Sequence, residues 1–493
     1  MIRIGKDTIK KQPKFWNHAL FHPTDAIEDP WGKRILDRIS ADGAIRTVRI
    51  YAMFEDIVYT DEDGKVCYDF RLSDLRLDYL LACGFELLIA FGGMPDCIVS
   101  TTAFSACMSK NATRYKGKMW NSEPPHDYAQ WEELCYEYTK HLVERYGEET
   151  VAKWYCHCFN EPDGSFWLRS VDKRDYNAKC AEYCKLYDAF VKGVRRASKG
   201  IRVGGPALAK HVEFLDPFLA HVKETGVELD YVALHTYGTG PKELNSGERP
   251  LATENHFDYA INPYLDCMRK YGFENVEMIL DEWGAASHGF YNVEECPQFM
   301  FRENEIYSAY FTKLIYELIK SGIPISKLMI CLSGQHEMVT DFSGFRNFFT
   351  LNFITKPIYN AHLMTSKMGD DLVSVDCARE DVYVVPTKDE AGKYAVMLTY
   401  CKKHFDEDLP AVTEEISFAE DICGKTVTVY CIDREHTNPY RVWERAGKPE
   451  MTEAFLRTLR EEGKLKPASV FVADGSPVAI NLTPNATFLI TVS

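Results

Sequence analysis

The chain has 493 residues, too many for one ordinary hydrophobic core, so the length predicts two domains. Its composition is globular, and the formal net charge of −16 argues against a nucleic-acid or anionic-membrane partner because no basic block offsets it. The opening residues MIRIGKDTIKKQPKFW lack the apolar stretch of a secretion signal, and no run approaches membrane-spanning length. Sixteen scattered cysteines suggest no disulfide framework, and we therefore expect a cytoplasmic protein.

Short apolar runs alternate with helical patterns from residue 15 to residue 370. Most of these runs are almost continuously apolar, which is typical of parallel strands covered on both faces. The sequence predicts eight such strands, at 18–21, 45–51, 85–93, 154–160, 201–207, 230–237, 276–283 and 327–334.

The segments between the strands carry helical periodicity. In 127–147 apolar residues recur every three or four positions, and Gly147 follows as a stop signal. The segment 303–324 has the same pattern and closes with Gly322 and Pro324. Eight alternations of strand and helix predict an α/β fold, a (β/α)₈ TIM barrel with long loops. A doubly wound open sheet, the alternative, would usually show a Gly-rich phosphate-binding turn, which the sequence does not contain.

Beyond residue 370 the pattern changes to short strands and turns. The stretches DVYVVP, KYAVMLTY, KTVTVYCI and ATFLITVS are typical of an all-β sandwich, with a polar, partly helical insertion at about 434–466. We therefore divide the chain into a catalytic barrel at 15–370 and an accessory β-sandwich at 371–493. Residues 1–14 are expected to pack with the sandwich.

Two glutamates stand where a barrel of this kind places its reactive groups. Glu161 ends the fourth predicted strand in WYCHCFNEPDGSFW, and Glu282 ends the seventh in LDEWG. Either one alone would more often be an ordinary loop residue. Together they lie on opposed parts of the barrel mouth, at the C-terminal ends of the strands. Two facing carboxylates are the minimal machinery of glycoside hydrolysis, in which one protonates the leaving oxygen and the other attacks the anomeric carbon or activates water.

The sequence resembles glycoside hydrolase family 39, the β-xylosidase and α-L-iduronidase group of barrel enzymes with catalytic glutamates on strands four and seven. The resemblance covers nearly the whole chain and is carried by KFWNHALF, VRIYAMFEDI, the block from SEPPHDYAQW to FNEPDGSFW, RVGGPAL, DYVALHTYG, LDEWGAAS, TKPIYNAHLM and HTNPYRVW. It implies a retaining, β-xylosidase-like exo-glycosidase; α-L-iduronidase-like and α-L-arabinosidase-like activities are the alternatives within the family. No metal or organic cofactor is expected, because carboxyl groups fill both roles.

The resemblance also implies roles for individual residues. Glu161 matches the acid/base and Glu282 the nucleophile of the family. Asn160 would hydrogen-bond the sugar 2-OH, and Tyr237 would hold the nucleophile carboxylate. The other expected sugar-site residues are Arg49, His235, Phe166, Trp167 and Trp283. For the last three, core packing is a near-equal alternative to stacking on the sugar. Asp56 is a weaker candidate that could equally cap a loop.

Several departures from the family pattern fall in the sugar pocket. Tyr51, which we also place at the site, stands where the family has His, and His157 and Phe159 replace Glu and Trp in the strand before Glu161. Asp281 adds an acidic group beside the nucleophile position, and the eighth strand ends in CLSGQHE without its usual Trp. The identity of the sugar therefore stays open.

Two hypotheses of other classes are weighed against the glycosidase. In one, the barrel binds carbohydrate without turnover because the pocket has changed; retention of both glutamates argues against it. In the other, a metal-dependent hydrolase uses His235, His336 and nearby acids, but the sequence shows no H-x-H or H-E-x-x-H spacing. The expected partner is a small oligosaccharide or glycoside, and a homo-oligomer is left open.

Overall fold

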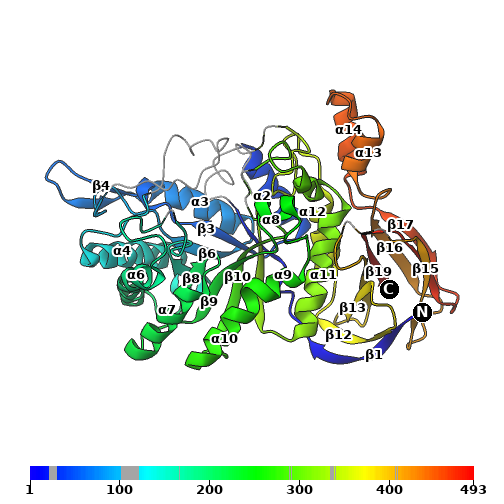
Figure 1. Ribbon diagram of the computed structural model, residues 1–493, viewed down its shortest axis with the longest axis horizontal. Coiled ribbons are helices and arrows are strands. Elements are labelled where there is room, and N and C mark those ends of the chain that lie inside the picture. The colour runs from blue at the N-terminus through cyan, green and yellow to red at the C-terminus, as the bar shows by residue number, and fades with distance from the viewer. Residues whose placement is uncertain are drawn as a thin grey trace.

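A computed structural model describes residues 1–21, 30–101, 121–165, 167–287, 289, 291–332, 338, 340–405, 407 and 409–493. Within them, eight parallel strands close into a barrel whose spatial order follows the chain (Figure 1). The strands are β2 (His18–Leu20), β3 (Thr47–Tyr51), β6 (Glu86–Phe91), β7 (Tyr155–Cys158), β8 (Arg202–Leu208), β9 (Tyr231–Tyr237), β10 (Glu277–Gly284) and β11 (Ile325–Cys331). The predicted barrel is confirmed, and each predicted strand is present.

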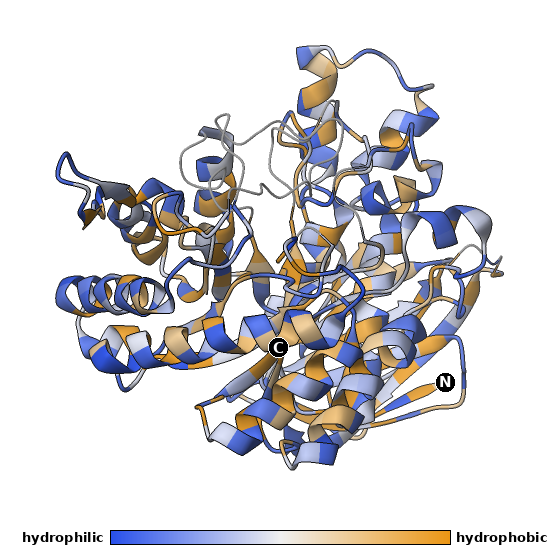
Figure 2. Cartoon of the chain, turned by 60° about the vertical axis from the view of Figure 1, so that its left-hand side comes forward, coloured by the Kyte–Doolittle hydropathy of each residue, from blue (hydrophilic) through white to orange (hydrophobic). Residues whose placement is uncertain are grey.

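Helices cover the outside of the barrel. The larger ones are α2 (Pro30–Asp42), α3 (Arg71–Ala82), α4 (Tyr128–Tyr146), α6 (Tyr176–Ala197), α7 (Val212–Thr225), α10 (Asn262–Tyr271), α11 (Glu305–Ser321) and α12 (Pro357–Ser366). Shorter elements are α5 (Glu148–Val151), α8 (Pro241–Ser246), α9 (Glu254–His256), the 3₁₀ helix η4 (Pro297–Glu303) and the hairpin β4 (Val58–Thr60)–β5 (Val66–Tyr68). Hydrophobic and hydrophilic residues alternate around these helices, as expected for one buried face (Figure 2).

Local sequence signals set the helix ends. The carboxylate of Asp127 accepts a hydrogen bond from the amide of Ala129 at the start of α4, and Gly147 ends that helix with φ 82°. Gly322 ends α11 in the left-handed conformation, with φ 69°. Both stop signals were expected from the sequence.

The rest of the chain forms a second domain around a nine-stranded sheet. Its strands are β1 (Ile2–Lys11), β12 (Asp371–Cys377), β13 (Val382–Lys388), β14 (Tyr394–Tyr400), β15 (Val412–Phe418), β16 (Thr426–Ile432), β17 (Pro467–Val472), β18 (Val478–Leu482) and β19 (Ala486–Val492). β1 pairs with β12 and β15. Residues of β15 and β18 share one buried cluster with residues of β16 and β19, so the sheet folds over its own core.

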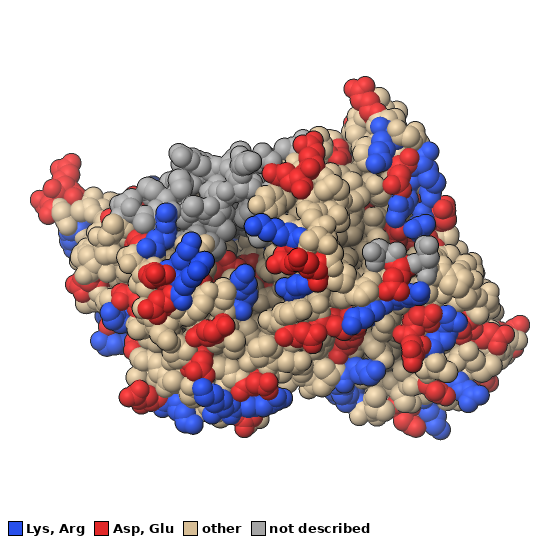
Figure 3. Space-filling model, in the orientation of Figure 1, with Lys and Arg blue, Asp and Glu red and all other residues tan. Residues whose placement is uncertain are grey.

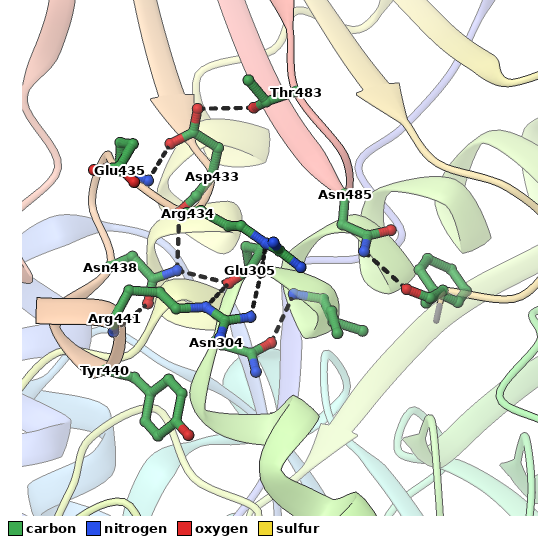
Figure 4. A network of polar contacts seen from close by, with 12 residues as sticks. Asn304, Glu305, Asp433, Arg434, Glu435, Asn438, Tyr440, Arg441, Thr483 and Asn485 are labelled. Atoms are coloured by element: carbon green, nitrogen blue, oxygen red, sulfur yellow. Dashed lines mark hydrogen bonds and ion pairs between the residues drawn. The ribbon is translucent and has the colours of Figure 1, made fainter. Parts of the chain in front are cut away.

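Helix α11 joins the two domains. Figure 1 shows it between the barrel and the sheet, and within it the hydroxyl of Thr312 lies 2.6 Å from that of Thr399 on β14. At its N-terminus the buried carboxylate of Glu305 accepts hydrogen bonds from Arg441 Nη2 (2.7 Å) and Nε (3.1 Å) and from Asn438 Nδ2 (2.8 Å), as Figure 4 shows. Arg441 lies in α13 (Pro439–Arg445), which with α14 (Glu453–Glu462) forms the helical insertion of the sheet domain. The HTNPYRVW stretch therefore contributes directly to the domain interface.

The surface carries charges of both signs. Acidic and basic side chains are interspersed on the described part of the face seen in Figure 3. Over the described ranges, none of the helices is both long enough and apolar enough to cross a membrane.

Candidate active site

The turn that carries Glu161 begins where β7 ends. Phe159 and Glu161 both have left-handed backbone conformations, with φ 59° and 49°. Such conformations are uncommon outside glycine and cluster at functional sites. Neighbouring strand ends hold the turn: the amide of Phe159 donates to the carbonyl of Phe91 (2.7 Å), and that of Glu161 to the carbonyl of Ala207 (3.0 Å). The backbone that directs the Glu161 side chain is thus fixed on both sides.

Strand β10 contains a bulge at Asp281. Leu280 pairs with Leu234 of β9 while Glu282 pairs with His235, so Asp281 is an extra residue in the register. In a regular strand successive side chains point to opposite faces, and a bulge re-aims one of them. Asp281 and Glu282 consequently both contact polar groups inside the barrel, where Asp281 is completely buried.

Arg49 of β3 lies at the centre of these groups and is itself completely buried. Its Nη1 donates to Glu282 Oε1 (2.7 Å), its Nη2 to Asn160 Oδ1 (2.5 Å) and its Nε to His157 Nε2 (3.2 Å). Asp281 Oδ2 lies 3.2 Å from the same Nε. Burial and the charge on Arg49 lower the pKa of His157 to about 3, which keeps this imidazole neutral and able to accept. One guanidinium therefore positions side chains from two other strands.

His235 of β9 bridges the two glutamates. Its Nδ1 lies 2.7 Å from Glu161 Oε1 and 3.5 Å from Glu282 Oε2, and its Nε2 lies 3.8 Å from Asp281 Oδ2. Burial alone would lower the pKa of His235, but the charges on Glu282 and Asp281 outweigh it and raise that pKa to about 10. The imidazole is thus a cation placed between two carboxyl groups.

Tyr237 and Arg346 complete the contacts of Glu282. The hydroxyl of Tyr237, at the end of β9, donates to Glu282 Oε2 (2.9 Å). Arg346 Nη1 in turn donates to that hydroxyl oxygen (2.7 Å). Each oxygen of the Glu282 carboxylate therefore has its own donor, Arg49 on one and Tyr237 on the other.

The two glutamates have pKa values shifted in opposite directions. Burial raises the pKa of Glu161, and the negative charge on Glu282 raises it further. The hydrogen bond from His235 acts in the opposite direction but is outweighed. Burial would also raise the pKa of Glu282, but the positive charges on His235, Arg49 and Arg346 outweigh it and lower that pKa. Two neighbouring carboxyl groups whose pKa values are shifted in opposite directions can serve as a proton donor and an ionised group in one site.

The structure brings most of the predicted site residues into one cluster at the barrel mouth. Tyr51 belongs to it, since its ring centroid lies 5.3 Å from the guanidinium carbon of Arg49. The complete set of predicted residues that meet there is Arg49, Tyr51, Asn160, Glu161, His235, Tyr237 and Glu282.

The predicted tryptophans do not join this cluster. Trp283 is completely buried and stacks on Phe311 of α11, with ring centroids 5.5 Å apart and an interplanar angle of 11°. Because it follows Glu282 in the strand, it points to the opposite face, toward the helix layer. Trp167 is also buried and packs edge-on against Phe159, at 4.9 Å. Phe166 lies outside the described residues.

Asp56 has a structural partner of its own. Its carboxylate accepts a hydrogen bond from Arg76 Nη2 of α3 (2.7 Å), and both side chains are buried. The residue that sequence reasoning missed is Arg346. It lies in 340–350, a segment without helix or strand that matches neither a strand end nor a catalytic motif.

Glu161, His235 and Glu282 each offer an atom within 4.8 Å of the others, which is close enough to hold a cation. A cation bound there would have to displace the proton that the charges on Glu282 and Asp281 hold on His235. His336, the other histidine of the metal hypothesis, lies outside the described residues. In the sheet domain Cys431, Asp433 and His436 form a second such group, in which Asp433 Oδ1 accepts a hydrogen bond from the amide of His436 (2.7 Å).

A closed parallel barrel with two carboxyl groups meeting at its mouth defines a class of enzyme, the barrel glycoside hydrolases. The sequence model of the family "Glycosyl hydrolases family 39" matches residues 1–476, and the chain belongs to that family.

Relatives with assigned activities agree. The chain is 24% identical over 477 residues to a beta-xylosidase of Caldicellulosiruptor saccharolyticus, covering 91% of this chain and 88% of the relative. It is 29% identical over 211 residues to the alpha-L-iduronidase of Homo sapiens, covering 39% of this chain and 28% of the relative. Among solved structures, a monomeric beta-xylosidase from Caulobacter crescentus CB15 aligns with a TM-score of 0.81 at 19% identity, covering 100% of this chain and 99% of that one. The chain is therefore a glycosidase.

Proposed function

We propose that the protein is a retaining, β-xylosidase-like exo-glycosidase, in which Glu161 is the acid/base and Glu282 the nucleophile. The observation that carries this proposal is the close approach of the two carboxyl groups. Oxygen atoms of Glu161 and Glu282 lie within 4.8 Å of each other. Retaining enzymes space their carboxyl groups about 5–5.5 Å apart, whereas inverting enzymes leave about 6.5–9.5 Å for a water molecule.

In the first step Glu282 attacks the anomeric carbon while Glu161 gives its proton to the leaving oxygen. The opposite pKa shifts suit these roles, because the attacking carboxylate is ionised and the donor keeps its proton. Arg49 and Tyr237 fix the two oxygens of the nucleophile. Since Arg49 also occupies Oδ1 of Asn160, we assign the Asn160 amide nitrogen to the sugar 2-OH.

In the second step water hydrolyses the glycosyl-enzyme. Glu161, now ionised, takes a proton from the water, whose oxygen bonds to the anomeric carbon and releases Glu282 as a carboxylate. Negative charge thus alternates between the two glutamates during the cycle. The cationic His235, 2.7 Å from one and 3.5 Å from the other, faces both and can stabilise whichever is charged.

The proposed sugar follows from the relatives. The beta-xylosidase relatives match 91% and 80% of this chain, and the alpha-L-iduronidase relatives at most 46%. A terminal β-xyloside of a small oligosaccharide or glycoconjugate is therefore the favoured substrate, ahead of an α-L-iduronide or α-L-arabinoside. The proposed location is the cytoplasm, as the composition suggests, and cell fractionation would check it.

Azide rescue of two matched variants tests the mechanism. With an activated aryl glycoside, E161A still forms the glycosyl-enzyme, and azide should attack it to give a glycosyl azide of retained configuration. In E282A azide should take the place of the missing nucleophile and give the opposite anomer. Identical anomers from the two variants would contradict the assigned roles.

A panel of aryl glycosides tests the substrate and the enzyme class together. The sugars are xylose, arabinose, glucose, galactose, fucose and a uronate, and the highest kcat/KM is expected for the β-xyloside. A wild-type protein that binds a sugar but hydrolyses none of them would favour the non-catalytic carbohydrate-binding alternative.

A further inference from the structure

The hydroxyl of Tyr237 stands between Arg346 and Glu282. Arg346 Nη1 donates to its oxygen at 2.7 Å, and the same oxygen lies 2.9 Å from Glu282 Oε2. A phenol has one proton to donate and two acceptor lone pairs, whereas a guanidinium has donors only. The phenol proton therefore cannot point at Arg346, which occupies a lone pair and leaves the proton for another acceptor.

Cys331 is the competing partner for that proton. It is the last residue of β11, and it belongs to the buried cluster against which Tyr237 packs. A thiol is a weak acceptor, while a carboxylate is a strong one. A cationic donor on the phenol oxygen polarises the O–H bond, which favours the charged acceptor further. Arg346 thus biases the hydroxyl toward Glu282.

The segment that carries Arg346 is held by buried groups outside the pocket. Arg302 Nη1 donates to the carbonyl of Gly344 (3.1 Å), and Lys356 Nζ donates to the carbonyl of Phe345 (2.9 Å). Both cationic side chains are almost completely buried. The backbone just before Arg346 is therefore fixed before any substrate arrives, as preorganisation of a site requires.

We propose that Arg346 is a positioning residue, which fixes the hydroxyl of Tyr237 as a donor to Glu282 and acts on the reaction through that contact. The inference rests on the proposed function, because it assumes that Glu282 is the nucleophile. The inference adds Arg346, from the 340–350 segment, to the residues that act on Glu282. It also explains why a third positive charge lies near Glu282, beside those of Arg49 and His235.

A double-mutant cycle on kcat/KM tests the coupling. Arg346→Met and Tyr237→Phe should each lower kcat/KM by about 10- to 100-fold, because each breaks the chain of hydrogen bonds that ends on the charged carboxylate. If Arg346 acts through Tyr237, R346M should cost less than about threefold in the Y237F background. Arg346→Gln, which also lacks the charge, replaces R346M in the cycle if thermal melting shows that R346M does not fold.

The pH profile gives a readout that a merely structural role would not move. R346M should shift the acidic limb of kcat/KM upward by about 1 pH unit, since one of the positive charges that hold Glu282 ionised is gone. R346K should keep the limb close to its wild-type position. The matched control is Arg76→Met, which removes another buried arginine with a carboxylate partner and should leave the limb unmoved.

Four results would overturn the inference. Losses that multiply in the double variant would show that Arg346 does not act through Tyr237. An acidic limb unmoved in R346M would show that Arg346 does not help to hold Glu282 ionised. A loss confined to uronate glycosides would show that it binds the sugar instead. A wild-type protein inactive on the whole glycoside panel would refute the proposed function, and this inference with it. The other results would refute this inference alone, so the two failures are distinguishable.

Discussion

Replacing Asp281 by asparagine tests how the buried charges of the site balance one another. Asp281 Oδ2 lies 3.8 Å from His235 Nε2, and both side chains are completely buried. With an effective dielectric constant of about 20, a pair of unit charges at that separation attracts by about 4 kcal/mol, or about 3 pKa units. The pKa of His235, raised to about 10 in the wild type against the effect of burial, should therefore fall to about 7 in D281N.

This change has a definite sign in stability. The folded-state pKa of His235 lies above its ordinary value of 6.5, so its protonation stabilises the fold fully below pH 6.5, and the stabilisation is lost as pH rises through about 10. In D281N most of it is already absent. Because of the lower pKa of His235, D281N should lose about 4 kcal/mol of unfolding free energy at pH 6 and less than about 1 kcal/mol at pH 10. Loss of the Arg49 ion pair adds a part that is constant over this range.

Urea unfolding at pH 6, 8 and 10, followed by tryptophan fluorescence, measures the difference. The control is Asp56→Asn, which removes another buried carboxylate paired with an arginine and should destabilise equally at all three values of pH. If D281N were destabilised by the same amount at pH 6 and pH 10, His235 would not be held as a cation by Asp281. The account of the site's electrostatics would then be refuted.

Three further outcomes are expected. Arg441→Met leaves the buried Glu305 carboxylate without its two-pronged partner and should lower the unfolding free energy by about 3–5 kcal/mol in urea titrations, with partial recovery in R441M/E305Q. Trp283→Phe should cost about 1–3 kcal/mol of stability but leave KM within about twofold, because the indole packs on α11; a tenfold rise in KM would place it in the pocket. Incubation with EDTA should leave kcat/KM unchanged, since carboxyl groups carry both chemical roles in the proposed mechanism, and activity lost to EDTA but restored by a divalent cation would contradict this.

The barrel is predictable because its signals are local. Each of its strands is a compact run of apolar residues between helical segments with their own stop signals, and β6 at Glu86–Phe91 falls inside the predicted 85–93. Strand order then follows from the rule that successive parallel strands connected by helices lie side by side. The placement of Glu161 and Glu282 at one mouth is a consequence of that topology, whereas the separate roles expected for them and for their neighbours needed the family resemblance.

What the sequence does not predict depends on pairing between distant segments. The bulge at Asp281 exists only in relation to the register of β9, so the inward direction of its side chain has no local signal. Arg346 meets Tyr237 across 109 residues, from a segment without regular structure. Trp283 lies beside Glu282 in sequence, yet strand alternation turns it away from the site.

The position of helix α11 affects how cooperatively the protein unfolds and whether its domains can be exchanged by recombination. The buried cluster of the barrel continues without a break into Val385, Met397 and Leu489 of the sheet domain, while α11 contributes to both sides. If the two parts were separated, each would expose the apolar side chains that it packs against the other. The protein should therefore unfold in a single cooperative transition, and recombination that exchanges one domain without redesigning this helix should yield chains that aggregate.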